Sequence, residues 1–139
     1  MKYIIIILIT IAGVLGYLNY KNLKFTDVVT EIARGDVIVE SPTKIDLVSS
    51  PVTVRGKAKG TWFFEAVFSM EIEDSDGGVL GTGVANAEGE WMTENMVPFS
   101  GDIVFNSPKG NKGFLVLYKD NPSGLPENSK SIRIPITFN

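Results

Sequence analysis

The chain has 139 residues with 13 basic and 16 acidic side chains, which gives a net charge of −3. This acidic balance argues against general nucleic-acid binding, which needs a basic surface. The chain contains no cysteine and no histidine. It therefore has no disulfide, thiol nucleophile, Ser-His-Asp triad or imidazole metal ligand. Carboxylates, lysines and tyrosines remain, but this composition favours a protein that is not an enzyme and holds no cofactor.

The first stretch, Tyr3–Tyr20, carries no charged side chain and is almost wholly apolar up to Leu18. As a helix it would span about 27 Å, close to the hydrocarbon thickness of a bilayer. Residues 1–20 are therefore predicted to form an uncleaved membrane anchor. A cleaved signal peptide and a buried core helix are the alternatives, and no A-x-A cleavage pattern follows the apolar run. The flanking lysines do not determine the orientation.

Residues 21–35 connect this segment to the rest of the chain. Phe25, Val28, Val29 and Ile32 recur at helical spacing, which predicts a short amphipathic helix or stiff stalk. Its apolar face would dock on the following domain or lie along the membrane surface.

From residue 36 to residue 139 the apolar period changes to two, which is typical of half-buried strands. Turn residues recur every 8–12 positions or so, as in immunoglobulin-like sandwiches. The prediction is an all-β, immunoglobulin-like antiparallel β-sandwich of about seven strands. The strand-like segments are 37–39, 45–48, 51–58, 64–73, 79–87, 91–96, 97–105, 114–119 and 131–138.

Alternation also predicts which side chains are buried. In the segment 64–73 the inward side chains would be Phe64, Ala66, Phe68, Met70 and Ile72, while Glu65, Ser69, Glu71 and Glu73 face outward. The core is predicted to contain Phe68, Ile72, Phe114 or Leu115, Val116, Ile134 and Ile136.

Two Ser-Pro units, Ser41-Pro42 and Ser50-Pro51, precede a V-x-V-x-G-x-A strand at residues 52–58. With the motifs Phe64-Glu65-Ala66, Gly83-x-Ala85, Gly89-x-Trp91 and Ile134-Pro135-Ile136, this order resembles the immunoglobulin-like domain of bacterial sporulation and spore-germination proteins. The resemblance covers Val37 to Phe138.

The resemblance implies a β-sandwich on the outer side of the cytoplasmic membrane, often beside other envelope modules, with no known catalytic residues. It does not imply a role in spores, since no germination module accompanies the domain in this sequence. The loop from Lys119 to Asn128 looks like that of a subset of such domains in non-sporulating bacteria.

Three aromatic side chains are candidates for a platform that binds a sugar or a peptide: Trp62, Trp91 and Tyr118. In the alternative interpretation, Trp62 closes one end of the sandwich while Phe64 packs inside it. Neighbouring side chains of Trp62-Phe63-Phe64 cannot all enter one core if the segment is extended.

The loop Asp120–Asn128 is long for a hairpin connection. Pro122, Gly124 and Pro126 predict a stiff loop. The candidate partner-binding residues here are Asp120, Asn121, Leu125 and Glu127. Three interpretations stay open: a structural loop with Leu125 folded back onto the sandwich, partner recognition through an exposed Leu125, and binding of a hard cation through its oxygen atoms.

Other constellations are weak. Asp74-x-Asp76-Gly77 fails the calcium-loop pattern and favours a hairpin turn. Gly81-x-Gly83 lacks the third glycine and the βαβ context of a dinucleotide site, so close strand packing is the better interpretation. Glu71 and Glu73 share an outward face that offers no apolar pocket for an acid/base pair.

These observations predict a non-catalytic, membrane-anchored, outward-facing module of the bacterial cell envelope that binds a protein or has a structural role. The alternative is a carbohydrate-recognition module for wall or surface glycans. The expected location is the cytoplasmic membrane, with a single pass and the domain on the extracytoplasmic side, or secretion if the N-terminal segment is cleaved. The expected partners are the membrane itself and an envelope protein or glycan, with no nucleic acid.

Overall fold

The structure is a computed structural model that describes residues 35–139. The predictions for residues 1–34, the membrane anchor and the connector, lie outside the described residues. Residues 36–139 form one compact unit. Within the described part of the chain, no helix is long and apolar enough to cross a membrane.

The unit is built almost entirely from β-strands, as the two-residue period predicts. Its only other regular elements are two single-turn 3₁₀ helices among the described residues, η1 (Gly60–Trp62) and η2 (Pro126–Asn128). The strands are β1 (Val37–Ser41), β2 (Leu47–Val48), β3 (Val52–Lys59), β4 (Val67–Asp74), β5 (Val79–Ala87), β6 (Met96–Ile103), β7 (Lys112–Tyr118) and β8 (Ser131–Phe138).

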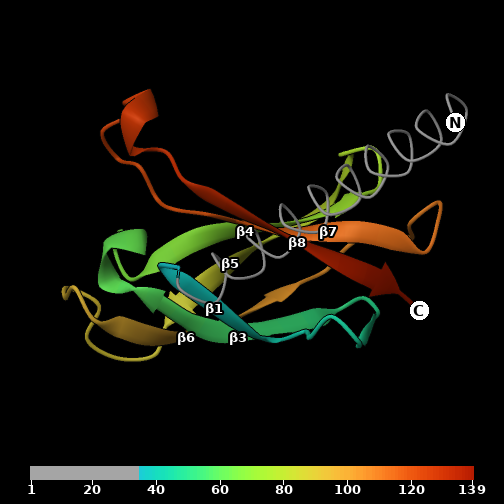
Figure 1. Cartoon of the computed structure of the whole chain (residues 1–139), viewed down its shortest axis with the longest axis horizontal. Coiled ribbons are helices and arrows are strands. Elements are labelled where there is room, and N and C mark those ends of the chain that lie inside the picture. The colour runs from blue at the N-terminus through green and yellow to red at the C-terminus, as the bar shows by residue number, and fades with distance from the viewer. Residues whose placement is uncertain (1–34) are drawn as a thin grey trace, which may run out of the picture. The chain divides into compact units, whose positions relative to one another are not determined.

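The eight strands form one continuous sheet in the order β1-β3-β6-β5-β4-β7-β8-β2. The sheet curls over so that β1, β3 and β6 form one layer and β4, β7 and β8 form the other (Figure 1). Every pairing is antiparallel except that of β2 with β8. The expectation of about seven antiparallel strands is thus corrected to eight strands with one parallel pair.

The first two strands lie at opposite edges of the sheet. β1 pairs with β3, and β2 pairs with β8, so the chain passes from one layer to the other between Ser41 and Leu47. Pro42 follows β1 directly and has no N–H to continue a ladder. The proline therefore ends β1 at the point where the chain changes layers.

The bend of the sheet lies at β5, which pairs with both β4 and β6. A Cβ atom on Gly81 or Gly83 would overlap backbone atoms of residues 102–105, and one on Gly101 would overlap the carbonyl oxygen of Val84. Only glycine permits this approach of two backbones. Close strand packing is therefore confirmed as the reason for Gly81-x-Gly83.

A cluster of aromatic side chains joins the two layers. Phe68 of β4 makes an edge-to-face contact with Phe99 of β6, with ring centroids 5.0 Å apart. It also contacts Trp62 at 5.9 Å and Phe63 at 5.1 Å. Such pairs contribute about 0.5–1.5 kcal/mol beyond the burial of their area. The predicted burial of Phe68, Ile72, Ile134 and Ile136 is confirmed.

The prediction that Phe64 faces inward is wrong, since its side chain is 43% exposed. Phe64 and Val67 exchange backbone hydrogen bonds of 3.0 and 3.1 Å around a tight turn. The two central residues, Glu65 and Ala66, have φ values of +49° and +66°. This left-handed backbone is the geometry of a type I′ turn and is rare for residues with a Cβ atom. The strand therefore begins at Val67.

Strand β7 resolves the choice between Phe114 and Leu115. Leu115 and Leu117 are fully buried in the core, and Phe114 is only partly buried. Val116 is buried as predicted but is not part of the main core cluster. It pairs with Glu71 of β4 and with Arg133 of β8, so alternation places it on the outer face of this layer.

An ion cluster links the two layers near the start of β1. The carboxylate of Asp36 lies 3.0 Å from the Lys59 ammonium at the end of β3 and 2.6 Å from the Lys130 ammonium before β8. Hydrogen bonds from Lys130 and then Lys59 lower the pKa of Asp36 from 3.8 to about 2. The folded state therefore stabilises the ionised form of the Asp36 carboxyl relative to the unfolded state.

Truncation of the aromatic cluster tests the core. Phe68→Ala should lower the free energy of unfolding by about 3–5 kcal/mol, because it removes a fully buried ring and leaves a cavity. Phe64→Ala is the matched control: the same truncation on a half-exposed ring should change stability by less, within about 0.5 kcal/mol if the ring makes only surface contacts. Chemical denaturation measures both. Equal losses of stability for the two variants would contradict the observed burial of Phe68 and exposure of Phe64.

The Asp36 cluster predicts a pH dependence. Because folding lowers the pKa of Asp36, its ion pairs stabilise the folded state at pH values above the usual pKa of 3.8. This stabilisation is lost as the pH falls through about 2. After allowance for solvent screening of a side chain that is 25% exposed, Asp36→Asn should cost about 1 kcal/mol at neutral pH. Denaturation of both proteins from about pH 6 to about pH 2 should show this difference shrinking towards zero. A difference for Asp36→Asn that stays constant over this pH range would refute the cluster's role.

Candidate functional site

Three connections meet at one end of the sandwich, on the left in Figure 1: residues 60–66, 88–95 and 119–130. The Gly60 N–H donates to the Asn95 carbonyl at 3.0 Å, and the Asp120 N–H donates to the Trp62 carbonyl at 3.0 Å. Loops held on a rigid scaffold are the usual carriers of binding residues. This loop end is therefore the candidate functional site.

Trp62 does not lie on the surface of the loop end. Its side chain is 2% exposed and packs edge-on against Phe68, and the neighbouring Phe63 is buried as well. The indole Nε1 has no hydrogen-bond acceptor among the described residues. The sequence alternative in which Trp62 closes the sandwich is correct for this residue, but it is Phe63 rather than Phe64 that packs inside with it.

The other two members of the predicted aromatic platform do not form a row with Trp62. Trp91 is partly buried and packs against the core. The Tyr118 hydroxyl donates to Glu71 Oε2 at 2.9 Å, and burial, followed by the Glu71 carboxylate, raises the pKa of Tyr118. No ring contact joins any two of these three side chains within residues 35–139.

The loop of residues 119–130, termed here the Leu125 loop, is stiffened by its own hydrogen bonds. The Asn121 side-chain amide donates to the Leu125 carbonyl at 2.8 Å and to Ser129 Oγ at 3.0 Å. Ser123 Oγ donates to Asn121 Oδ1 at 2.6 Å and accepts from the Leu125 N–H at 3.2 Å. The Asn128 amide donates to Ser123 Oγ at 3.0 Å. This network agrees with the stiff loop predicted from its prolines and glycine.

The Leu125 side chain is 50% exposed and does not join the core cluster. Leu125 therefore lies outside the core, and half of its surface is available to a partner. Asp120 is partly buried and Glu127 is exposed, and the Asn121 oxygen is already used within the loop. The described residues contain no group of three or more acidic side chains that could hold a metal ion, so the loop geometry gives no support to cation binding.

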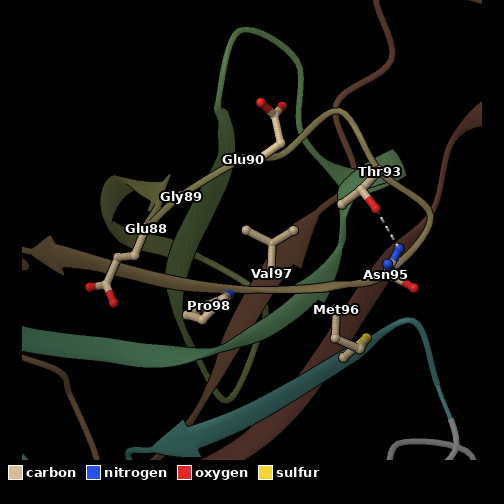
Figure 2. Close-up of a pocket in the computed structure, with 8 residues that line it drawn as sticks. All are labelled: Glu88, Gly89, Glu90, Thr93, Asn95, Met96, Val97 and Pro98. Carbon is tan, nitrogen blue, oxygen red and sulfur yellow. Dashed lines mark hydrogen bonds between the residues drawn. The ribbon is translucent and has the colours of Figure 1, made fainter.

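Two hollows flank the segment 88–95. The larger, with a volume of about 490 Å³, is lined by Gly60, Thr61, Phe63, Trp91, Met92, Thr93 and Glu94. The smaller, with a volume of about 300 Å³, is lined by Glu88, Gly89, Glu90, Thr93, Asn95, Met96, Val97 and Pro98 (Figure 2). Both are open to solvent and share Thr93, which accepts a hydrogen bond from the Asn95 N–H at 3.2 Å (Figure 2).

From this segment the sequence analysis named only Trp91 as a candidate binding residue. Residues 91–96 are strand-like by composition, yet β6 begins only at Met96 and residues 88–95 form a loop. The signal that could have shown this is the density of turn-forming residues in Glu88-Gly89 and Thr93-Glu94-Asn95. Met92 is the clearest missed residue, since it lines the larger hollow and its side chain is 74% exposed.

Glu71 and Glu73 share the outward face of β4, as predicted, but they do not form a catalytic pair. Glu71 accepts from Tyr118. Glu73 Oε2 accepts from both Nε and Nη2 of Arg133, at 3.0 and 2.7 Å, and the guanidinium of Arg133 lies 3.8 Å from the centroid of the Phe114 ring. Each carboxylate thus has a different structural partner.

The predicted hairpin at Asp74–Gly78 is confirmed. It joins β4 to β5, and Asp74 Oδ1 accepts from the N–H groups of Asp76 and Gly78 at 2.9 and 2.7 Å. The Asp74 carboxylate therefore stabilises the turn backbone.

Comparison with known proteins identifies the domain. No curated protein and no solved structure gives a significant match to this chain. A sequence model of the Gmad2 family, the immunoglobulin-like domain of bacterial spore germination, matches residues 36–125. The matched range runs from the start of the strand region into the Leu125 loop and covers well over half of the chain. The chain therefore belongs to the Gmad2 family of immunoglobulin-like domains.

Proposed function

We propose that this protein is a membrane-anchored, outward-facing immunoglobulin-like module of the bacterial cell envelope that binds a protein partner through the Leu125 loop. The family supports a non-catalytic binding or structural module. Among residues 35–139, no polar or charged side chain is fully buried. The largest pKa shifts that desolvation produces in acid/base groups occur at fully buried positions.

The observation that carries the proposal is the geometry of the Leu125 loop. A half-exposed leucine lies at the tip of a loop whose backbone is fixed by the side chains of Asn121, Ser123 and Asn128. A rigid loop loses little conformational entropy on binding, which favours affinity. An exposed apolar side chain on such a loop fits an apolar pocket of a partner protein better than it fits a glycan.

The membrane anchor rests on the apolar stretch 3–20 and its lack of a cleavage site. The outward orientation rests on the resemblance to this family of domains, which implies a position on the outer side of the cytoplasmic membrane. The glycan alternative is weakened because the buried Trp62 is lost from the aromatic platform.

Membrane fractionation tests the topology. We expect the full-length protein to stay in the membrane fraction after an alkaline carbonate wash, because an apolar helix of this length partitions into lipid. Protease added outside the cell should degrade the domain while a cytoplasmic control protein stays intact. A mature soluble protein that begins near Tyr17 would contradict the anchor.

Crosslinking in native membranes tests the Leu125 loop. Leu125→Ala should abolish the crosslinked species while changing stability by no more than about 0.5 kcal/mol, as for an ordinary surface substitution. The matched control is Leu47→Ala, which truncates an exposed leucine at the opposite end of the sandwich. Crosslinks that persist in Leu125→Ala, or that disappear equally in Leu47→Ala, would refute recognition by the loop.

A further inference from the structure

We infer that the two hollows along residues 88–95 form a second binding surface, which takes a short extended segment of a partner protein in which lysine or arginine alternates with apolar side chains. The inference rests on the proposed binding role of the domain, but not on the membrane anchor or on Leu125. It is carried by charge, by exposed apolar atoms and by the rigidity of the segment.

All the charged side chains of the two loops that border the hollows are acidic. The loops 60–66 and 88–95 contain four glutamates and neither lysine nor arginine. All four glutamate side chains are exposed: Glu65, Glu88, Glu90 and Glu94. The domain as a whole carries nine basic and fourteen acidic side chains over residues 35–139. Most of its net charge of −5 therefore lies on these two loops.

Two basic side chains near the smaller hollow are already paired. Lys57 and Lys59 of β3 are the cross-strand partners of Pro98 and Met96, but they form ion pairs with Glu40 and Asp36. Among the described residues, none of the ion pairs, which also include Lys130–Asp36 and Arg133–Glu73, involves one of the four glutamates. Within residues 35–139, Glu88 accepts from the Ser100 hydroxyl and Glu90 accepts from the Met92 N–H. A basic partner segment would supply the missing countercharge and would be steered towards this end.

The hollows also offer apolar contact area. The half-buried Trp91 and the exposed Met92 line the larger one, above the buried ring of Phe63. The smaller one is lined by Met96, Val97 and Pro98 (Figure 2). Methionine adapts its shape to different apolar partners and is common on peptide-binding surfaces. Small-molecule sites bury most of the surface of their ligand, whereas both hollows are open to solvent. Open hollows of this kind suit side chains at successive positions of a peptide.

The segment between the hollows is held in place before any partner arrives. The Glu88 N–H donates to the Pro98 carbonyl at 2.8 Å, and the Thr93 N–H donates to the Trp91 carbonyl at 2.8 Å. Gly60 packs so closely beneath the segment that a Cβ there would overlap the carbonyl oxygens of Trp91 and Thr93. Preorganisation of this kind lowers the entropic cost of binding.

The chemistry excludes the two anionic classes of partner. Nucleic acid binds through its phosphates and would meet repulsion from the four glutamates, and a surface of anionic lipids would meet the same repulsion. A basic protein segment with apolar side chains is the partner whose charge and apolar surface both fit.

Fluorescence of the full-length protein tests the inference with synthetic peptides. The probe is a five-residue peptide of alternating lysine and leucine, capped at both ends. The chain has two tryptophans, and because Trp62 is buried while Trp91 lines the larger hollow, binding should change mainly the Trp91 emission. The double variant Glu90→Gln with Glu94→Gln should weaken binding about tenfold at low salt, and less at high salt because screening replaces the lost attraction.

The controls separate charge, apolar contact and non-specific attraction. Met92→Ala should weaken binding about threefold, as expected for the loss of a modest apolar contact. Asp76→Asn removes one exposed charge from the β4–β5 hairpin, away from the loops 60–66 and 88–95, and should leave the affinity unchanged. Peptides with glutamate in place of lysine, or serine in place of leucine, should fail to bind.

Equal affinity of the double variant and the unmodified protein would overturn the inference, as would equal binding of the serine peptide or the glutamate peptide. Failure here with Leu125-dependent crosslinks intact would leave the proposed function standing. If the peptide binds but no crosslink depends on Leu125, the binding role of the Leu125 loop is refuted and the second binding surface is retained.

Discussion

The rest of the domain depends on the buried ring of Phe68. It bridges the two layers through Phe99, and it supports the connection 60–63 through Trp62 and Phe63. The same ring thus stabilises the sandwich and fixes the backbone beneath one end of it. Since Gly60 lies on that backbone and contacts the segment 88–95, the shape of the hollows follows from the packing of the core.

A second constraint is the close approach of two strands at the bend of the sheet. Without side chains at Gly81, Gly83 and Gly101, the backbones of β5 and β6 come close enough for one continuous sheet to fold over itself. Curling leaves only two edges, and β1 and β2 occupy them as short strands on either side of Pro42. Short edge strands offer little template for pairing with another chain, which favours a domain that meets partners through its loops.

The sequence predicts the parts of this fold that depend on local alternation, and it fails where distant packing decides. Burying one face of β4 or β8 requires only a two-residue period, so Phe68 and Ile134 could be assigned from the sequence. Phe64 could not, because the turn after it uses Glu65 and Ala66 in left-handed conformations without the Asn-Gly pair that normally marks such a turn. The parallel pairing of β2 with β8 could not be predicted either, because a strand of two residues is too short to show an alternating pattern in the sequence.

The two candidate surfaces at the loop end also differ in whether local or distant contacts hold them in place. This difference determines how each would respond to substitutions. The stiffness of the Leu125 loop comes from hydrogen bonds of Asn121, Ser123 and Asn128 within the loop. It is therefore a local property, and the prolines and the glycine of the loop predict it from the sequence. The geometry of residues 88–95 is supported from below by Gly60, and through it by the Phe68 cluster. A weakened core would therefore distort the hollows while the Leu125 loop kept its own hydrogen bonds. Conversely, a substitution at Leu125 should cost the fold little, because the Leu125 side chain lies outside the core cluster. If the loop binds a partner as proposed, its specificity could therefore change without loss of the fold.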